Sequence, residues 1–505
     1  MTYETPVSAF AAAAAPVSPA LFADPAPIDP GNFLLDVDSY KIAHAGMYPE
    51  DLTHLSAYIE ARHPWAAPEG APAAATIDEI VFFGLQVALA RLAGPVVTQA
   101  MVDEAAPFLT AHGLAPQLSG WQRIVDVHGG HLPVEIAALP EGARVAPGVP
   151  QVRIENTDPE LPWLVTWLET RLLRTVWYAS TVASLSAHVM GAIRERMKIT
   201  DGTDAGAAFK LHDFGGRGAT AFESAALGGL AHLVNALGTD TVPALALGRN
   251  VYGAEMAGFS IPASEHSVMT VRGEERECAQ MRRILEAHPT GLVACVSDSY
   301  DLMRAVRDYW GSDLREAVLA RSGTLVIRPD SGDPVEIVPQ VIEALMAAFG
   351  EEKTDTGYRI LPPQVRVIQG DGIDRVSVLD IMEAMMARGL AIGNIAFGMG
   401  AGLLQKLDRD SFSYAAKVSA ARHGSGPWEP VRKDPVTAAG AKTSKAGRQA
   451  AVRSAEGRIV AAQADSLPTW IDALQPVFRD GVILKAWTLA HVRARAWPNA
   501  ADLAG

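Results

Sequence analysis

The stretch Gly323-Thr-Leu-Val-Ile-Arg-Pro-Asp-Ser-Gly-Asp333 joins a short apolar run to a turn rich in charged residues. Residues 324–327 are leucine or β-branched, which predicts a buried strand that ends abruptly at the proline that follows. Arg328 and Asp330 therefore leave the end of a core strand side by side. A fixed cation next to a fixed carboxylate suits a ligand that carries both hydroxyl groups and negative charge.

The same arrangement recurs along the chain. Five further apolar runs end in Gly, Asp, Arg or His, and the later ones precede helical patterns: residues 208–211, 259–261, 292–296, 365–368 and 395–397. In parallel α/β proteins, and above all in barrels, ligands bind at the carboxyl ends of the strands. A single ending of this kind is commonly a loop that forms salt bridges, but six of them predict a shared site in an α/β fold.

Length and composition set outer bounds. The chain has 505 residues, of which 49% are hydrophobic and 20% charged, enough for two domains or for a barrel with a companion domain. The formal net charge of -14 argues against a general nucleic-acid binder. Cys278 and Cys295 are the only cysteines, so we expect neither a disulfide framework nor a cysteine zinc site, and a reducing cytoplasm is the natural setting.

Two segments superficially resemble a signal peptide or a membrane span. Residues 1–31, rich in Ala and Pro, lack a basic start and are interrupted by Pro and Asp, which predicts a disordered tail. Residues 161–197 are long and apolar, but Glu169, Arg171 and Arg174 interrupt them. A buried amphipathic helix is therefore predicted there, and no membrane span.

Several strand ends carry groups that can bind a phosphorylated sugar. Gly398-x-Gly-x-Gly402 offers backbone N–H groups before a helical run, although no Walker lysine or complete dinucleotide fingerprint accompanies it. Asp330 and Asp371 can hydrogen-bond a ribose diol. Arg217 and Arg328 can neutralise a phosphate or donate to an amide oxygen.

His266 follows Glu265 at another predicted strand end. A lone histidine is usually structural, but Asp298, from the next run, is a carboxylate that could fix its tautomer. The histidine could then act as a nucleophile or move a proton. No metal-binding box is found, so a metal is expected to arrive with a phosphate ligand.

Eight ordered motifs together resemble the nicotinamide phosphoribosyltransferase family. They are Lys210-Leu-His-Asp-Phe-Gly-Gly-Arg-Gly218, Ala231-His-Leu-Val-Asn235, Gly238-Thr-Asp-Thr-Val242, Pro262-Ala-Ser-Glu-His-Ser267, Val296-Ser-Asp-Ser-Tyr-Asp301, Ile327-Arg-Pro-Asp-Ser-Gly332, Arg366-Val-Ile-Gln-Gly-Asp-Gly372 and Leu403-Leu-Gln-Lys-Leu407. The resemblance runs from about residue 32 into the C-terminal part.

The resemblance implies a type II phosphoribosyltransferase architecture. Residues 181–405 would form an irregular (β/α) barrel-like domain, and residues 32–180 with 406–505 a mixed α+β domain built from both chain ends. The family works as a homodimer with two shared active sites. The implied reaction joins nicotinamide to 5-phosphoribosyl 1-diphosphate, with Mg²⁺ on the diphosphate, and gives nicotinamide mononucleotide and pyrophosphate. No nucleic acid or membrane is involved.

The resemblance also assigns roles to residues. Phe214 and the partner subunit's Tyr40 would sandwich the pyridine ring, Asp240 would accept from the carboxamide, and Arg328 would donate to its oxygen. His266 matches a histidine phosphorylated from ATP, with Asp298 and Glu265 beside it. The remaining implied contacts are Asp330, Gly370 and Asp371 to the ribose, Gly400 and Ala401 with Arg217 to the 5-phosphate, and Arg62, Arg409, Lys417, Lys433 and Lys442 to ATP and diphosphate.

Three departures from the family pattern affect phosphate binding. Ala415 and Met399 replace serines, and Ala401 replaces a glycine, but backbone donation survives such changes. Three other functions remain open at this point. The first is nicotinate phosphoribosyltransferase, which Asp240 opposes because a carboxylate substrate would meet a like charge. The second is a phosphate-binding barrel aldolase or synthase, but no strand-end lysine for a Schiff base is found. The third is a non-enzymatic signalling or scaffold protein.

Overall fold

A parallel sheet from the middle of the chain lies at the centre of the fold. The computed structural model describes residues 31–503 apart from residues 115, 436–443 and 470. The sheet has the order β7-β6-β13-β12-β9-β8, and all its pairings are parallel. Its strands are β6 (Leu211–Asp213), β7 (Gly238–Thr239), β8 (Val293–Val296), β9 (Leu325–Arg328), β12 (Val365–Gln369) and β13 (Ile395–Met399).

Strand β9 confirms the strand predicted from the opening stretch. Its apolar residues are buried because helices cover one face of the sheet and side chains fill the other. Asp333 then caps helix α12 (Pro334–Phe349): its side chain accepts from the Val335 N–H at 3.0 Å, and Pro334 occupies the first turn. The stretch therefore specifies the strand, the turn and the start of the next helix.

Two predicted strands differ from the structure. Residues 208 and 209 lie in the 3₁₀ helix η6 (Ala207–Phe209), and strand β6 begins only at Leu211. Residues 259–261 form no strand. Phe259 and Ala263 instead make isolated parallel bridges to Gly238 in β7 and to Ala294 in β8. Pro262 interrupts regular pairing because it has no N–H to donate. The segment nevertheless lies between the two edge strands of the sheet, which gives the sheet its half-barrel curvature.

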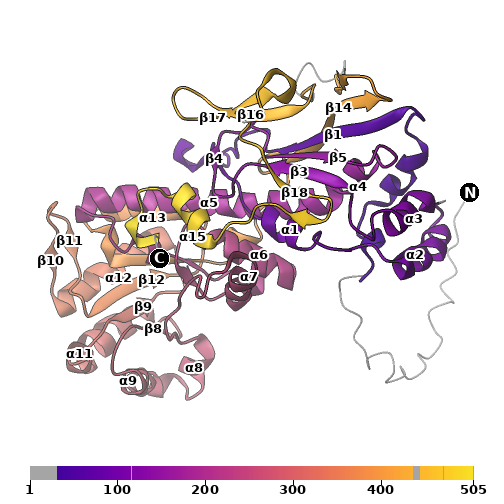
Figure 1. Ribbon diagram of the computed structural model, residues 1–505. Helices are drawn as coiled ribbons and strands as arrows, with labels where there is room; N and C mark the ends of the chain where they lie inside the picture. The colour runs from indigo at the N-terminus through magenta and orange to yellow at the C-terminus, as the bar shows by residue number, and fades with distance from the viewer. Residues whose placement is uncertain (1–30, 115, 436–443, 470, 504–505) are drawn as a thin grey trace, which may run out of the picture.

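Helices follow the strands, as the sequence predicts. Helix α12 packs on β12 and α9 on β8, on the outside of the sheet (Figure 1). The helices of this part are α6 (Phe222–His232), α7 (Val242–Tyr252), α8 (His266–Thr270), α9 (Glu277–Ala287), α10 (Leu302–Arg304), the π-helix η9 (Ala305–Asp313), α11 (Arg315–Leu319), α13 (Ser377–Ala387) and α14 (Ala401–Leu404).

The second sheet has seven antiparallel strands, which come from the parts of the chain before and after the parallel sheet. Its order is β15-β14-β1-β5-β3-β18-β19. Its strands are β1 (Leu52–Glu60), β3 (Val134–Ala138), β5 (Val152–Asn156), β14 (Ala415–His423), β15 (Trp428–Pro430), β18 (Gln475–Arg479) and β19 (Val482–Ile483). The helices outside the parallel part are α1 (Leu85–Ala90), α2 (Gln99–Ala111), α3 (Leu118–Asp126), α4 (Leu164–Trp167) and α15 (Leu489–Ala496).

Helix α5 (Glu169–Asp201) runs across the molecule between the two sheets (Figure 1). It is continuous through residue 180, where the sequence suggested a domain boundary. Its middle is buried, which agrees with the predicted buried helix. Among residues 31–503 with the gaps given above, no helix has the length and apolarity needed to cross a membrane. The predicted disordered tail lies, apart from Gly31, outside the described residues.

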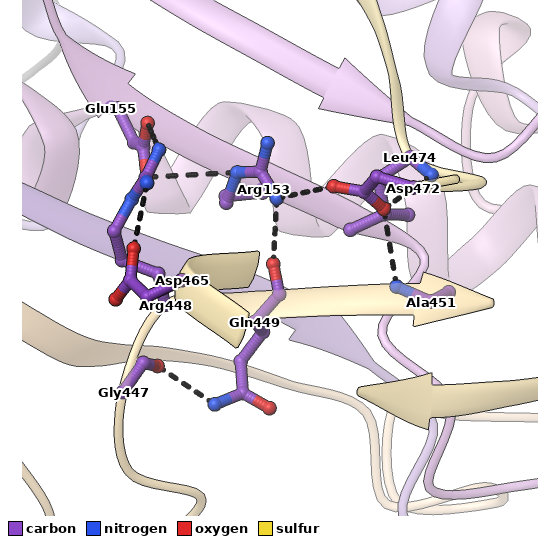
Figure 2. A network of polar contacts seen from close by, with 9 residues as sticks. All are labelled: Arg153, Glu155, Gly447, Arg448, Gln449, Ala451, Asp465, Asp472 and Leu474. Carbon is purple, nitrogen blue, oxygen red and sulfur yellow. Dashed lines mark hydrogen bonds and ion pairs between the residues drawn. The ribbon is translucent and has the colours of Figure 1, made fainter. Parts of the chain in front are cut away.

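A buried network of charges fastens the C-terminal hairpin of β16 (Gln449–Arg453) and β17 (Ile459–Gln463) to the antiparallel sheet (Figure 2). Arg153 donates to Asp472 at 2.8 Å, and Arg448 donates to both oxygens of Glu155 at 2.8 and 2.9 Å. Burial alone would raise the pKa of Glu155, but Arg448 and Arg153 together lower it below its usual value. Arg448, the residue just before β16, thereby attaches the hairpin to the sheet.

Candidate active site

The ring of Phe214 lies at the carboxyl end of β6. Its backbone N–H donates to the carbonyl of Met399 at 3.0 Å, and the ring packs on an inward-facing cluster that includes Val326 and Ile368. A Cβ atom added to Gly398 would lie 2.0 Å from Cε2 of this ring. Glycine at 398 therefore leaves the space that the ring occupies. The ring is only partly buried, so it remains available to a ligand.

Arg328 and Asp330 lie beside this ring. Their side chains form an ion pair of 3.5 Å, and a Cβ added to Gly370 would lie 3.3 Å from both Asp330 Oδ1 and Phe214 Cε2. Burial raises the pKa of Asp330, Arg328 opposes the rise, and the charges of Asp298 and Asp371 add to it. The strand ends of β6, β9 and β12 therefore bring an aromatic face, a cation and carboxylates together, as the sequence predicts.

His266 begins helix α8, at the edge of the same site. Its Nε2 lies 2.9 Å from Oδ1 of Asp298, whose side chain is only 5% exposed, whereas the histidine side chain is 48% exposed. Because a carboxylate only accepts, Nε2 carries the proton and Nδ1 keeps a lone pair for chemistry. Glu265 makes a different contact, because it accepts from the Ser267 hydroxyl.

Asp240 and Arg217 line one hollow at the surface, next to Thr241. The Ser260 hydroxyl donates to Oδ1 of Asp240, which fixes one oxygen of that carboxylate. Beneath them Asp213 is buried, and burial raises its pKa to about 6. Its Oδ1 accepts from the Gly215 N–H at 2.7 Å, which shapes the turn after Phe214.

The glycine-rich motif divides between two elements. Gly398 belongs to strand β13, where its lack of a side chain leaves space for the Phe214 ring. Gly400 precedes the single turn of α14. Gly218 approaches the N–H of Ala401, since an added Cβ would lie 3.5 Å from that nitrogen. Two facing turns thus leave backbone donors at this strand end.

Four of the five predicted ATP and diphosphate residues form a second cluster. Loss of water around the ammonium group and then the charges of Arg62, Lys433 and Arg409 lower the pKa of Lys417. This cluster belongs to β1, β14 and their neighbours, which lie at the opposite side of the molecule from β8 and α8 (Figure 1). Lys442 lies outside the described residues.

Tyr40 also lies apart from Phe214. Its ring is 60% exposed and contacts His44 within the 3₁₀ helix η4 (Ser39–Gly46). The adjacent Lys41 is buried and bonds Glu169 of α5 at 2.7 Å, which holds η4 in place and leaves Tyr40 directed to solvent. One chain therefore does not bring Tyr40 and the basic cluster to the strand-end site.

Sequence reasoning missed Ser260, Asp213 and the spatial role of Gly398. Ser260 lies in one of the quoted runs and Asp213 in one of the quoted motifs. The contact of Ser260 is with Asp240, twenty residues away, and Asp213 is buried only by the packing of the folded chain. For Gly398 the only signal was a glycine inside an apolar run, which is typical of close backbone approach in a strand.

Comparison with known proteins adds to this geometry. Residues 209–474 match the model of the nicotinate phosphoribosyltransferase (NAPRTase) family, and residues 32–136 match the nicotinamide phosphoribosyltransferase N-terminal domain. The chain is 46% identical over 473 residues to a nicotinamide phosphoribosyltransferase of Xanthomonas campestris, covering 92% of this chain and 98% of that protein. It is 30% identical to one of Acinetobacter baylyi, with coverage of 92% and 97%.

Two solved structures share the fold. One is a nicotinate-nucleotide pyrophosphorylase from Pyrococcus furiosus, with a TM-score of 0.57, 16% identity and coverage of 93% of this chain and 95% of that chain. The other is human nicotinic acid phosphoribosyltransferase, with a TM-score of 0.55, 19% identity and coverage of 91% and 92%. The match of both family models and the identity across nearly the whole chain lead to one conclusion: the chain belongs to the nicotinamide phosphoribosyltransferases of the NAPRTase family.

Proposed function

We propose that the protein transfers the 5-phosphoribosyl group from 5-phosphoribosyl 1-diphosphate to nicotinamide in NAD salvage. The products are nicotinamide mononucleotide and pyrophosphate. The observation that carries the proposal is the Phe214 ring at a strand end, with Arg328 and Asp330 beside it. A flat heterocycle can stack there while a sugar reaches the carboxylates.

The bond changes need no acid or base at the ring. The lone pair of the pyridine nitrogen forms the bond to C1 of the ribose, and the C1–O bond breaks with its electron pair leaving on the diphosphate. Positive charge develops on the ribose in the transition state, so the site works by positioning and electrostatics. Asp330 and Asp371, which lie near each other at the strand ends, are the carboxylates that would hold the ribose hydroxyls, with Gly370 between them.

Asp240 would choose the amide over the acid. Because the Ser260 hydroxyl holds one oxygen of Asp240, the other oxygen is available to accept from a carboxamide NH₂. A nicotinate carboxylate would meet a like charge there. Arg328 would donate to the amide oxygen, and its Nε has no hydrogen-bond partner among the described residues. The backbone N–H groups of Gly400 and Ala401, with Arg217, would bind the 5-phosphate.

His266 would accept a phosphoryl group from ATP. Its Nδ1 lone pair would form the N–P bond while the P–O bond to ADP breaks and ADP keeps the electron pair. The Nε2 proton would stay in the hydrogen bond to Asp298, which stabilises the charged ring. Glu265, next along the chain, would contribute charge near the phosphoryl group.

Mg²⁺ would enter with its ligand. No cluster of three or more His, Cys, Asp or Glu side chains within the described ranges is placed to hold a metal ion. The residues therefore fit an ion carried by diphosphate oxygens, which when bound would neutralise the negative charge of the leaving group.

The active site would be completed by a second copy of the chain. The exposed Tyr40 and the basic cluster of Arg62, Arg409, Lys417 and Lys433 lie away from Phe214 in one chain, and a homodimer would bring both to the partner's strand ends. We also propose two domains, one made of residues 32–180 with 406–505 and the other of residues 181–405. The antiparallel sheet supports the first domain, because its strands come from residues 32–180 and from residues 406–505.

A cytoplasmic location also remains a proposal, which the two free cysteines support. The deciding experiment for the whole function is product analysis of the purified protein with 5-phosphoribosyl 1-diphosphate and either nicotinamide or nicotinate, with and without ATP. We expect nicotinamide mononucleotide with nicotinamide, and more of it when ATP is present. Turnover of nicotinate in preference to nicotinamide would favour the related nicotinate activity, and no nucleotide from either would refute the proposal.

A further inference from the structure

Asp213, the last residue of β6, is a buried carboxyl group between the two residues proposed to recognise nicotinamide. Its exposed fraction is 0%. Phe214, which carries the aromatic face, follows it directly, and Asp240 follows the neighbouring strand β7. Burying a carboxylate costs free energy unless it is hydrogen-bonded, so an apolar residue would be less costly at this strand end. The presence of Asp213 there therefore calls for a role.

The side chain of Asp213 fixes the turn that carries Phe214. Its Oδ1 accepts from the Gly215 N–H at 2.7 Å, two residues further on, which is the hydrogen bond of an Asx-turn. Phe214 lies between these two residues, and its own N–H donates to the Met399 carbonyl at 3.0 Å. The aromatic ring therefore leaves the strand from a backbone that is held on both sides.

The main chain of Asp213 holds the loop that carries Asp240. The Asp213 carbonyl accepts from the Asp240 N–H at 2.9 Å. Thr241, the next residue, packs against the turn itself, because a Cβ added to Gly216 would lie 3.0 Å from the threonine hydroxyl oxygen. A displacement of the turn would therefore be transmitted to the loop by direct contact.

Helix α6 closes the space behind the carboxyl group. A Cβ added to Gly229 of this helix would lie 3.0 Å from Asp213 Oδ2 and 2.8 Å from Cβ of Ala244 in α7. The two helices and the strand end thus meet at a glycine, which leaves just the room that the carboxyl group fills. The side chain of Asp213 is therefore confined to the orientation in which it holds Gly215.

We propose that Asp213 is a positioning residue for nicotinamide, which keeps the Phe214 ring and the Asp240 carboxylate at the separation that a pyridine carboxamide needs. The inference rests on the proposed function, in which the substrate stacks on Phe214 and its amide donates to Asp240. Burial raises the pKa of Asp213 to about 6. The hydrogen bond to Gly215 does not depend on this titration, because a protonated carboxyl group still accepts at its carbonyl oxygen.

The residues proposed for the second substrate depend less on Asp213. Asp330 and Asp371, proposed to hold the ribose, follow β9 and β12, and neither strand pairs with β6. Arg217, proposed for the 5-phosphate, lies in the turn after Phe214, so a small effect on this substrate is expected as well. Loss of the Asp213 side chain should therefore weaken the binding of nicotinamide more than that of 5-phosphoribosyl 1-diphosphate.

The test replaces Asp213 by alanine, which removes the acceptor, and by asparagine, which keeps it. KM for each substrate, kcat and thermal unfolding are measured on the full-length protein. Asp201→Ala is the matched control, because the Asp201 carboxylate also accepts from a glycine N–H, that of Gly393 at 3.0 Å. Gly393 lies just before β13, at the amino end of the parallel strands and thus away from the site. If Asp213→Ala does not fold, Asp213→Val, which suits a strand and also lacks an acceptor, takes its place.

We expect Asp213→Ala to raise the KM for nicotinamide by about tenfold or more, the size of a lost hydrogen bond to a charged acceptor. The KM for 5-phosphoribosyl 1-diphosphate should rise by less than about threefold. Asp213→Asn should stay within about threefold of wild type for both substrates, because asparagine forms the same turn. Asp201→Ala should lower the unfolding temperature and leave both KM values within about twofold of wild type.

A merely structural role of Asp213 would lower the amount of folded enzyme, and with it kcat, without changing either KM. An unchanged KM for nicotinamide in folded Asp213→Ala would therefore overturn the inference. An equal rise for both substrates, or an asparagine variant with the KM of the alanine variant, would overturn it too. Each of these results leaves the transfer reaction in place, because wild type is active. A wild type that forms no nicotinamide mononucleotide would instead refute the proposed function, and this inference with it.

Discussion

The contact between Gly398 and Phe214 gives the sharpest prediction. Replacing Gly398 by alanine places a Cβ 2.0 Å from a ring atom of Phe214, closer than any real contact allows. The strand cannot move away, because β13 is paired with β6 and β12 on its two sides. We therefore expect the Phe214 ring to leave its position, so that nicotinamide loses the aromatic face on which it stacks.

The size of the loss follows from the stacked face. Covering one face of a pyridine ring removes about 50 Å² from water, or about 1.3 kcal/mol at about 25 cal/mol per Å². The geometry of an aromatic pair adds about 0.5–1.5 kcal/mol. The sum of about 2–3 kcal/mol corresponds to a KM for nicotinamide raised about 30- to 150-fold if the ring is displaced entirely. Overpacking should also cost about 1–3 kcal/mol of stability.

The assay measures KM separately for nicotinamide and for 5-phosphoribosyl 1-diphosphate, together with thermal unfolding. Gly191→Ala is the matched control, because it lies in α5 and an added Cβ has no atom within 4 Å. We expect its kinetics to match wild type. The reasoning is refuted if Gly398→Ala folds and binds nicotinamide within about twofold of wild type, since that change is below the stacking energy alone.

Three further predictions concern specificity, assembly and stability. Asp240→Asn should weaken nicotinamide use and admit some nicotinate, and an unchanged preference in competition kinetics would remove Asp240 from substrate choice. Mixing Tyr40→Ala and Phe214→Ala subunits should restore activity in heterodimers, which then contain one intact pair of rings; a verified heterodimer without activity would count against a shared site. Arg448→Met should lower the free energy of unfolding in urea by about 3 kcal/mol, the low end for a broken buried pair, because Arg153 stays 3.6 Å from Glu155. Since the folded-state pKa of Glu155 is lowered, its contribution is present above about pH 4.3 and is lost as the pH falls through the folded value, so the difference from wild type should shrink in acid.

Apolar runs were sufficient to predict most of the parallel strands. Residues 324–327, 292–296 and 365–368 are all strands within one or two residues, because a strand buried on both faces has a nearly continuous apolar sequence. Residues 259–261 have the same composition, but Pro262 and the curvature of the sheet leave only isolated bridges there.

Within the site, the sequence predicted groups at strand ends more reliably than their partners. Arg328 and Asp330 lie together because a strand and its turn place them, and this is local information. The Ser260–Asp240 bond depends on a segment that runs along the edge of the sheet, so no local pattern signals it. Glu277 lies in a charged run that is typical of an exposed helix start, and only packing against β8 and η9 buries it.

The sequence by itself determined that strands alternate with helices, where β8, β9 and β12 end, and, through eight motifs, the family. Local hydrophobicity and turn chemistry are enough for these conclusions. Only the tertiary structure decided that the Phe214 ring rests on Gly398, that the carboxyl group of Glu277 is buried, and that Tyr40 and the basic cluster lie away from the strand ends. These features depend on strand register and on contacts between segments far apart in the chain. The free energy of such contacts cannot be inferred from any single stretch of residues.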